Sequence, residues 1–322
     1  MPLFSVVIPT YNRRERLLRA VRSVLAQRTK DAEIVVVDDG SSDDSAEAVA
    51  ALGPSVRVIR QRNQGPSVAR TRGVAEASGR YVAFLDSDDH WFPWTLETFA
   101  RAIDAHDAPA WLYGFGTVEG RGVVAEEEPL VARAFPHYSA AAAEDGLMPR
   151  PTGVCIAREA FLRSGGFRET MRVGEDLDLW FRIAEEGRFV LIEAPLLYAR
   201  EEVQGESLGE DVSRSFAGLT ELVAREHRGG YRGGAATAFV RRAIISRQFM
   251  YYARRYREQG ERARAARIYL EVLRLQARSG FREAAFGGRR NRFLLTFPLF
   301  FASPALHRKL LGQRSDGTPA RV

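Results

Sequence analysis

Residues 81–89 read Tyr-Val-Ala-Phe-Leu-Asp-Ser-Asp-Asp, an apolar run that leads directly into three carboxylates. The run from Tyr81 to Leu85 is typical of a buried strand. Carboxylates this close together repel one another unless a cation lies among them, and Mg²⁺ and Mn²⁺ prefer hard oxygen ligands of this kind. The pattern therefore predicts a site for a metal and a phosphorylated ligand. The alternative is an acidic turn that caps a helix over residues 93–103.

Two other apolar runs, residues 4–8 and 33–37, also end in polar loops. The first is followed by Pro-Thr-Tyr-Asn-Arg (9–13) and the second by Asp-Asp-Gly-Ser-Ser-Asp (38–43). Segments with helical spacing of apolar residues separate the strands, which indicates the βαβ alternation of a parallel sheet. Because ligands bind beyond the carboxyl ends of the strands in such sheets, we expect all three polar loops to face one ligand.

Five short motifs follow one another along the first two-thirds of the chain. They are Ser-Val-Val-Ile-Pro-Thr-Tyr-Asn-Arg (5–13), Val-Asp-Asp-Gly-Ser-Ser-Asp (37–43), Asn-Gln-Gly-Pro-Ser-Val-Ala-Arg-Thr-Arg-Gly (63–73), Phe-Leu-Asp-Ser-Asp-Asp (84–89), and Gly-Gly-Phe-Arg (165–168) with Gly-Glu-Asp-Leu-Asp-Leu-Trp (174–180). Together they resemble glycosyltransferase family 2, the inverting nucleotide-sugar transferases of GT-A fold. One such motif is weak, but five in order are specific. The resemblance implies an α/β protein in which helices flank a mixed, mostly parallel sheet.

The resemblance also implies how the acidic cluster acts. Asp88 would ligate a divalent cation, Mg²⁺ or Mn²⁺, that bridges the two phosphates of the donor. Asp86 would contact the ribose or the donor sugar, or bind the metal through water. For Asp89, capping of the helix that follows is the alternative to a place in the site.

The nucleobase pocket is implied by the first two motifs. Tyr11 resembles the residue that stacks on the base, Pro9 and Thr10 would shape the same pocket through the backbone, and Asp39 would accept the imide proton of the base. An imide proton beside a carbonyl oxygen is a feature of uracil and thymine. The predicted donor is therefore a UDP- or dTDP-sugar, and a GDP-sugar is the less favoured alternative. Asp38 would fix the loop.

The acidic pair Glu175-Asp176 resembles the catalytic-base region of the family. Asp176 would be the general base, a role open to a carboxylate at neutral pH when burial raises its pKa. Asp178 is predicted to be a helix-start acid favoured by the helix dipole. Trp180 is predicted to pack in the core.

The third motif carries two arginines. Arg70 resembles the arginine that lies near the donor in the Ala-Arg-Asn-x-Gly motif of the family, although Thr71 stands where Asn is usual. We expect Arg70 to be functional. Arg72 is expected to pair with acids on the helix surface.

Charge and pattern divide the chain in two. Residues 205–322 carry 23 Lys and Arg against 10 Asp and Glu, a net charge of +13, and because the whole chain carries +6, residues 1–204 carry −7. We predict a GT-A catalytic domain over 1–204, with a nucleotide-sugar half to about 116 and an acceptor and base half from about 117. A basic helical region follows, with helices at 216–227, 235–256 and 261–277. Residues 119–148 show no clean period and are predicted to be a mobile loop over the site.

Localisation is predicted from three features. The single cysteine, Cys155, excludes an intrachain disulfide and suits a reducing compartment. The amino terminus shows no export signal, so we expect a cytoplasmic protein. Residues 293–306 are rich in Phe and Leu, lie between cationic flanks and contain two prolines, a pattern that suits the inner face of an anionic cell membrane. A segment packed as core or subunit interface is the alternative.

The leading hypothesis is an inverting, metal-dependent glycosyltransferase that moves a sugar from a nucleotide donor to an acceptor hydroxyl in polysaccharide, glycolipid or cell-surface glycan synthesis. The acceptor is not identified by any motif, and a lipid-linked one is among the candidates. A sugar-phosphate nucleotidyltransferase is the first alternative, but the loop after residue 8 lacks glycines that would cradle a phosphate. A non-catalytic scaffold that docks on membrane or partners is the second. Nucleic-acid binding is not predicted, because the arginines are not interleaved with aromatic residues.

Overall fold

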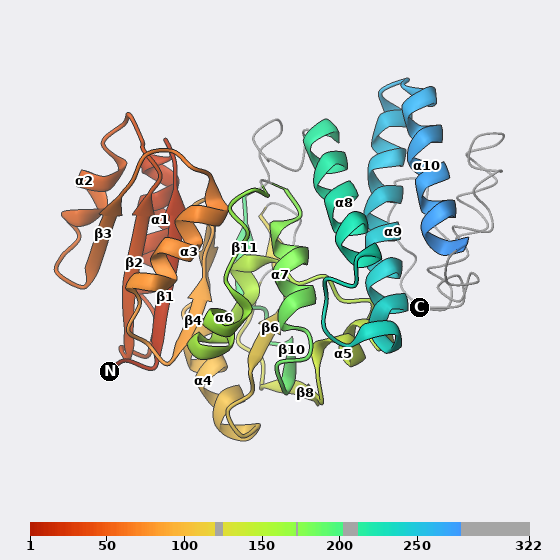
Figure 1. Ribbon diagram of the computed structural model, residues 1–322. Helices are drawn as coiled ribbons and strands as arrows, with labels where there is room; N and C mark the ends of the chain where they lie inside the picture. The colour runs from red at the N-terminus through yellow and green to blue at the C-terminus, as the bar shows by residue number, and fades with distance from the viewer. Residues whose placement is uncertain (120–124, 172, 202–211, 278–322) are drawn as a thin grey trace. The chain divides into compact units, whose positions relative to one another are not determined.

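The computed structural model describes residues 1–119, 125–171, 173–201 and 212–277 (Figure 1). It divides into two compact units. Unit 1 comprises Met1–Ala141 and Met148–Gly218, and unit 2 comprises Ala142–Leu147 and the chain from Leu219 onward. Every residue predicted to act in the site belongs to unit 1. The predicted division after residue 204 stays a prediction.

Unit 1 is built on an eight-stranded sheet with strand order β3-β2-β1-β4-β9-β6-β10-β8. Strands β3, β2, β1 and β4 are parallel, β9 runs antiparallel between β4 and β6, β10 is parallel to β6, and β8 is an antiparallel edge strand. The strand bounds are β1 Phe4–Thr10, β2 Ala32–Asp38, β3 Val56–Arg60, β4 Tyr81–Phe84, β6 Trp111–Gly114, β8 Val131–Phe135, β9 Val154–Ala157 and β10 Phe189–Ala194. The predicted mixed, mostly parallel sheet is confirmed.

A second, three-stranded sheet begins at the last residue of the acidic cluster. Its order is β5 (Asp89–Trp91), β11 (Tyr198–Arg200) and β7 (Gly116–Val118), with β5 antiparallel and β7 parallel to β11. Because β5 begins at Asp89, this carboxylate does not cap a helix. The next helix, α4, starts only at Thr95, so the capping alternative is wrong.

Helices complete the two units. Those of unit 1 are α1 Arg14–Leu25, α2 Ser45–Ala50, α3 Pro66–Glu76, α4 Thr95–Ala105, a 3₁₀ turn at Pro151–Gly153, α6 Arg158–Ser164 and α7 Glu175–Ile183. Helices α5 (Tyr138–Asp145) and α8 (Val212–His227) contain residues of both units. In unit 2, α9 (Gly234–Glu258) and α10 (Arg262–Ala277) lie side by side, joined by a turn at Gly260, as the helical spacing predicts (Figure 1).

The central strands are buried on both faces, which explains their continuous apolar runs. All seven residues of β1 are buried. Val6 and Ile8 belong to the core cluster that contains Leu17 and Val21 of α1. Val7 lies on the opposite face, against α3. This double burial fixes where β1 ends and therefore where its polar loop begins.

The described part of 119–148 is more regular than its sequence suggests. It contains β8, which pairs with β10, and α5, so the prediction that the whole segment is a loop is wrong. An edge strand with mostly exposed or half-buried residues shows little alternation, and four consecutive alanines favour a helix without creating an apolar stripe.

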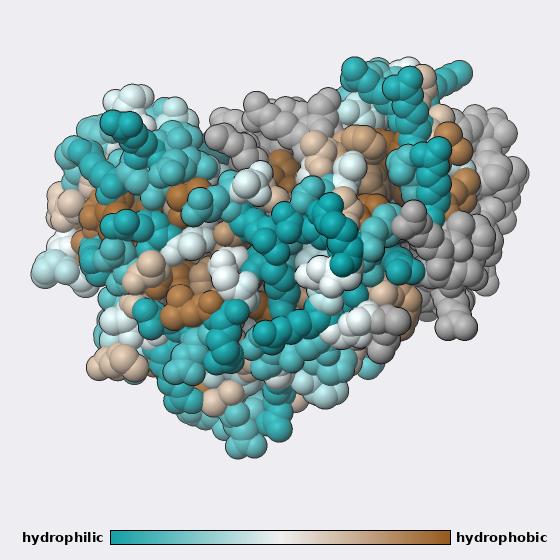
Figure 2. Space-filling model, viewed as in Figure 1, coloured by the Kyte–Doolittle hydropathy of each residue, from teal (hydrophilic) through white to brown (hydrophobic). Residues whose placement is uncertain are grey.

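The structure does not test the membrane hypothesis, because residues 293–306 lie outside the described residues. Within the part of the chain that is described, no helix combines the length and the apolar character needed to cross a bilayer. The face drawn in Figure 2 is largely hydrophilic, with apolar colour in separate, smaller areas.

Helix α3 approaches the sheet through Gly73. A Cβ atom at this position would lie 3.2 Å from Val37 Cγ2 and closer than van der Waals contact allows to Val7 Cγ1. Only a glycine lets the helix backbone come this near to both strands. The glycine that ends the third sequence motif thus sets the spacing between α3 and the sheet.

Substitution at this contact tests the packing of unit 1. We expect Gly73→Val to lower the free energy of unfolding by about 2 kcal/mol, because the new side chain overpacks a closed interface. Ala75→Val is the matched control, since Ala75 is exposed on the same helix and should lose only about 0.7 kcal/mol of helix propensity. Urea denaturation of both variants measures the difference, and equal losses would contradict the close approach.

Candidate functional site

The loops that follow β1 and β2 are tied together by Asn12. Its backbone N–H donates to Ser41 Oγ at 2.9 Å, and its Oδ1 accepts the N–H of Ser42 at 2.7 Å. Asn12 has φ 51°, a left-handed conformation that asparagine tolerates well. Next to it Tyr11 is 48% exposed, so much of this residue is accessible to a ligand. The structure therefore presents Tyr11 on a braced loop.

Pro9 and Thr10 lie at the buried end of β1, beneath that loop. Thr10 is 3% exposed, and its hydroxyl has no hydrogen-bond partner among the described residues. A buried hydroxyl without a partner is uncommon in folded proteins.

Asp39 is buried and holds the loop that leads into α3. Its Oδ1 accepts hydrogen bonds from Gln61 Nε2 at 2.8 Å and Gln64 N at 2.9 Å, and its Oδ2 accepts one from Gly65 N at 2.7 Å. A carboxylate offers about four acceptor positions, so one remains for a further donor. This bracing role was not visible in the sequence, because the three donors lie more than twenty residues away.

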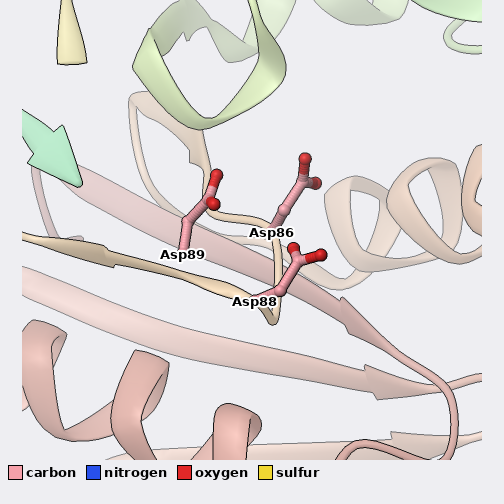
Figure 3. A group of neighbouring side chains, drawn as sticks. All are labelled: Asp86, Asp88 and Asp89. Atoms are coloured by element: carbon pink, nitrogen blue, oxygen red, sulfur yellow. The ribbon is translucent and has the colours of Figure 1, made fainter. Parts of the chain in front are cut away.

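The acidic cluster is compact. Asp86, Asp88 and Asp89 each offer a carboxylate oxygen, and these oxygens lie within 4.8 Å of one another. Figure 3 shows the three side chains rising to the same side of the bend between β4 and β5. Thr152 supports the bend from outside: its hydroxyl accepts the N–H of Asp86 at 3.2 Å and donates to Asp89 Oδ2 at 2.6 Å. The sequence pattern gave no indication of Thr152.

Negative charge is concentrated in this cluster. Burial, followed by the charge of Asp86, raises the pKa of Asp89 to about 8. One cationic group already faces the cluster, because Arg13 Nη1 lies 2.5 Å from Asp88 Oδ2. The three carboxylates could form a metal site, and their hard oxygens fit a small divalent cation. Arg13 belongs to the first motif but was given no role from the sequence.

Arg70 joins the acidic cluster to helix α7. Its Nη2 lies 2.6 Å from Asp86 Oδ1 and its Nη1 lies 3.2 Å from Glu175 Oε1, while the side chain is only 7% exposed. The guanidinium also lies over the ring of Phe167, 5.4 Å from its centroid. Burial alone would lower the pKa of Arg70, but the charges of Asp86 and Glu175 raise it above its ordinary value. Arg72 instead forms an exposed ion pair with Glu76.

The acidic pair begins α7, directly after the left-handed Gly174. Burial and then the charge of Asp176 raise the pKa of Glu175 to about 7. Burial also raises the pKa of Asp176, whose Oδ1 accepts the N–H of Leu177 at 2.7 Å. Among the described residues Asp176 forms no ion pair, whereas Glu175 is held by Arg70. Carboxylates with raised pKa values suit proton transfer near neutral pH.

The motifs thus meet in one place in unit 1, and comparison with known proteins identifies the family. The model of "Glycosyl transferase family 2" matches residues 5–161. The chain belongs to glycosyltransferase family 2.

Curated proteins similar to this family 2 chain include several glycosyltransferases. A "GalNAc(5)-diNAcBac-PP-undecaprenol beta-1,3-glucosyltransferase" of Campylobacter jejuni is 29% identical over 231 residues, which cover 69% of this chain and 73% of that protein. The succinoglycan biosynthesis protein ExoO of Rhizobium meliloti is 42% identical over 110 residues, 34% of this chain and 32% of ExoO. An uncharacterized glycosyltransferase of Rickettsia conorii is 31% identical over 187 residues, 56% of this chain and 30% of its own length. The chain thus spans about a third of the last two relatives.

Solved structures confirm the predicted GT-A fold for this family 2 member. S. aureus TarS 1-349 in complex with UDP-GlcNAc matches with a TM-score of 0.64 at 18% identity, covering 97% of this chain and 89% of that one. The mannosyltransferase PcManGT of Pyrobaculum calidifontis, in complex with GDP-Man and Mn²⁺, matches with a TM-score of 0.56 at 19% identity, covering 96% and 83%.

In this glycosyltransferase Asp178 braces the segment that precedes the acidic pair. It lies in the first turn of α7, as predicted, but it is fully buried, and its Oδ2 lies 3.0 Å from Arg168 Nε and 2.8 Å from Arg182 Nε. Arg182 in turn donates to the carbonyl of Gly166 at 2.6 Å. Ion pairing therefore dominates over the helix dipole at this residue.

The structure also places Trp180 of the fifth motif and Thr71 of the third. Trp180 is buried and stacks on Trp111 with ring centroids 5.2 Å apart, which confirms it as a core residue. Thr71, at the position where Asn is usual, donates its hydroxyl to the carbonyl of Phe167 at 3.4 Å. The third and fifth motifs are thus in direct contact.

Removing the charge of Asp178 should destabilise unit 1. We expect Asp178→Asn to lower the free energy of unfolding by about 3 kcal/mol, because it leaves Arg182 buried without its counter-charge. Glu159→Gln is the matched control: Glu159 is exposed and lies 3.7 Å from Arg163 in an i,i+4 pair, which is worth about 0.5 kcal/mol or less. Urea unfolding curves compare the two variants, and a similar small loss in both would contradict a bracing role.

Proposed function

We propose that this chain transfers a sugar, with inversion, from a UDP- or dTDP-sugar to an acceptor hydroxyl. One observation carries the proposal: Arg70 contacts Asp86 of the acidic cluster and Glu175 of the acidic pair at the same time. Displacement at an anomeric carbon needs stabilisation of the departing phosphate, a base for the hydroxyl, and a fixed distance between the two. The arrangement in unit 1 supplies groups suited to each need.

The donor is assigned to the β1 and β2 loops. Tyr11 would stack on the nucleobase with its exposed ring, Pro9 and Thr10 would line the pocket, and Asp39 would use its remaining acceptor position for the imide N–H. UDP-GlcNAc and UDP are bound by the TarS structures, which supports a uridine nucleotide. PcManGT binds GDP-Man, so a guanosine nucleotide is the outcome that would correct this assignment.

The divalent cation, Mg²⁺ or Mn²⁺, is assigned to Asp88 and Asp86, with Asp89 beside them. When bound, the cation would supply positive charge that stabilises the leaving diphosphate. The protein's own residues would do the rest of the positioning: Thr152 fixes the bend, and Arg70 holds Asp86 against rotation. The Mn²⁺ complex of PcManGT supports a metal in this fold.

Asp176 is proposed as the general base, with Glu175 as a positioning residue. The carboxylate of Glu175 is held by Arg70 at 3.2 Å, whereas Asp176 has no ion-pair partner among the described residues and is free to meet a hydroxyl. A base that deprotonates the acceptor hydroxyl lets it attack from the side opposite the leaving phosphate. A single displacement of this kind inverts the anomeric configuration.

A lipid-linked acceptor in glycan or glycolipid synthesis is the favoured class. The Campylobacter jejuni relative is named for a PP-undecaprenol-linked glycan. Such an acceptor would bring the chain to the cytoplasmic surface of a membrane. The basic residues after 204 would favour contact with anionic lipid there.

Metal dependence can be tested by nucleotide binding. We expect wild-type protein to bind UDP at least about tenfold more tightly with Mn²⁺ than with EDTA, and Asp88→Asn to lose most of this difference. Asp104→Asn, an exposed acid of α4, is the charge-matched control. Calorimetric titration measures the affinities. Equal UDP affinity with Mn²⁺ and with EDTA in wild type would remove the metal from the proposal, and tighter binding of GDP would change the donor.

The base can be tested by donor hydrolysis across a panel of UDP-, dTDP- and GDP-sugars. We expect Asp176→Asn to lower turnover by about 10²- to 10⁴-fold with little change in UDP affinity, because the substitution keeps the shape and removes the basic group. Glu169→Gln, an exposed acid in the same region, should have no effect. A larger loss of turnover in Glu175→Gln than in Asp176→Asn would assign the base to Glu175.

A further inference from the structure

A cavity of about 310 Å³ lies in unit 1, beyond the residues assigned to the donor. It is lined by β6, β7, β11 and the residue before the 3₁₀ turn, with side chains of Tyr113, Phe115, Thr117, Val118, Arg150, Tyr198 and Arg200. No step proposed above uses these residues. The cavity therefore needs an explanation of its own.

Two arginines, Arg150 and Arg200, line this cavity without a direct ion pair, although their charges act on Asp176 and Asp89. Within the described ranges, neither Arg150 nor Arg200 forms an ion pair with a carboxylate. Most other arginines of unit 1 that border the site do so, for example Arg13 with Asp88 and Arg70 with Asp86. Two unpaired guanidiniums in one concave site favour an anionic group, and planar arginines suit phosphate oxygens in particular.

The aromatic lining of the cavity is closely packed. The ring of Tyr198 occupies the space that a side chain at Gly116 would need, and it also lies within 2.8 Å of where a Cβ of Gly153 would be. Burial raises the pKa of both Tyr113 and Tyr198, whose side chains hydrogen-bond to each other. The cavity thus combines closely packed aromatic walls, a pair of tyrosine hydroxyls and two positive charges.

The arginines that line the cavity lie near the proposed base and near the acidic cluster. The charge of Arg150 acts on Asp176, where it opposes the rise in pKa caused by burial. Arg200 lies opposite Asp89 in the register of β11 and β5. An anion held by the two arginines would therefore lie beside the proposed base and outside the donor loops.

We propose that this cavity is an acceptor subsite that binds a phosphate group of the acceptor through Arg150 and Arg200. The inference rests on the proposed function, because it assigns the acceptor to a class, hydroxyl compounds that carry phosphate or diphosphate. The phosphate would hold the acceptor while one of its hydroxyls reaches Asp176. Phe115 and Val118 add apolar surface that suits a hydrocarbon next to the phosphate.

The test measures phosphate binding to the full-length protein while the donor site is filled with UDP and Mg²⁺. We expect inorganic phosphate to bind wild type, and Arg150→Gln and Arg200→Gln each to weaken it by at least about tenfold, the loss expected for a charge-assisted hydrogen bond. Arg101→Gln, which removes an exposed arginine of α4, is the control and should stay within about twofold of wild type. The circular dichroism spectrum of the same variants reports that unit 1 remains folded.

Five results would decide the matter. Unchanged phosphate affinity in both variants would overturn the subsite, and a fall in UDP affinity with Arg200→Gln would overturn it by giving that arginine to the donor diphosphate. Farnesyl phosphate that binds more tightly than inorganic phosphate would support the subsite and point to a lipid, whereas equal affinities would support it for a water-soluble phosphate. If wild type binds phosphate as expected but hydrolyses no nucleotide sugar, the subsite stands and the proposed transfer fails.

Discussion

The contact of Arg70 with two carboxylates is the interaction on which the site depends. Asp86 follows β4, and Glu175 starts α7, so one buried guanidinium joins segments that lie 16 and 105 residues away from it in sequence. A charge that is only 7% exposed would be costly without these partners. The same contact leaves Asp176 as the unpaired member of the acidic pair among the described residues. The direct contact with Arg70 thus distinguishes Glu175 from its neighbour Asp176.

Much of the donor side of the fold could be predicted because its signals are local. Strands buried on both faces give unbroken apolar runs, and the change to Asp86 after Leu85 marks the sheet edge sharply. Parallel topology then brings the loops after β1, β2 and β4 to that edge. The predicted convergence of these motifs needed no long-range information.

The parts that could not be predicted depend on contacts between distant residues. Thr152 and Asp89 are 63 residues apart, and no spacing rule connects a threonine before β9 to a carboxylate in β5. The pairing of Asp178 with Arg168 and Arg182 likewise requires knowledge of how α7 packs. Strand β8 and helix α5 within 119–148 could not be predicted, because an edge strand and an alanine-rich helix both lack strong periodicity. The cavity beside Arg150 and Arg200 combines four separate elements and has no motif at all.

The close approach at Gly73 also affects how precisely the Arg70 guanidinium is positioned. Gly73 lies three residues after Arg70, so both occupy the same side of α3. Because no side chain separates Gly73 from β1, the backbone of α3 already lies against the sheet. The distance from this backbone to the carboxylates that Arg70 contacts is therefore set by the packing. Groups that are already aligned need little reorganisation during a reaction. In that sense Gly73 acts as the spacer that sets the distance of Arg70 from its two carboxylates.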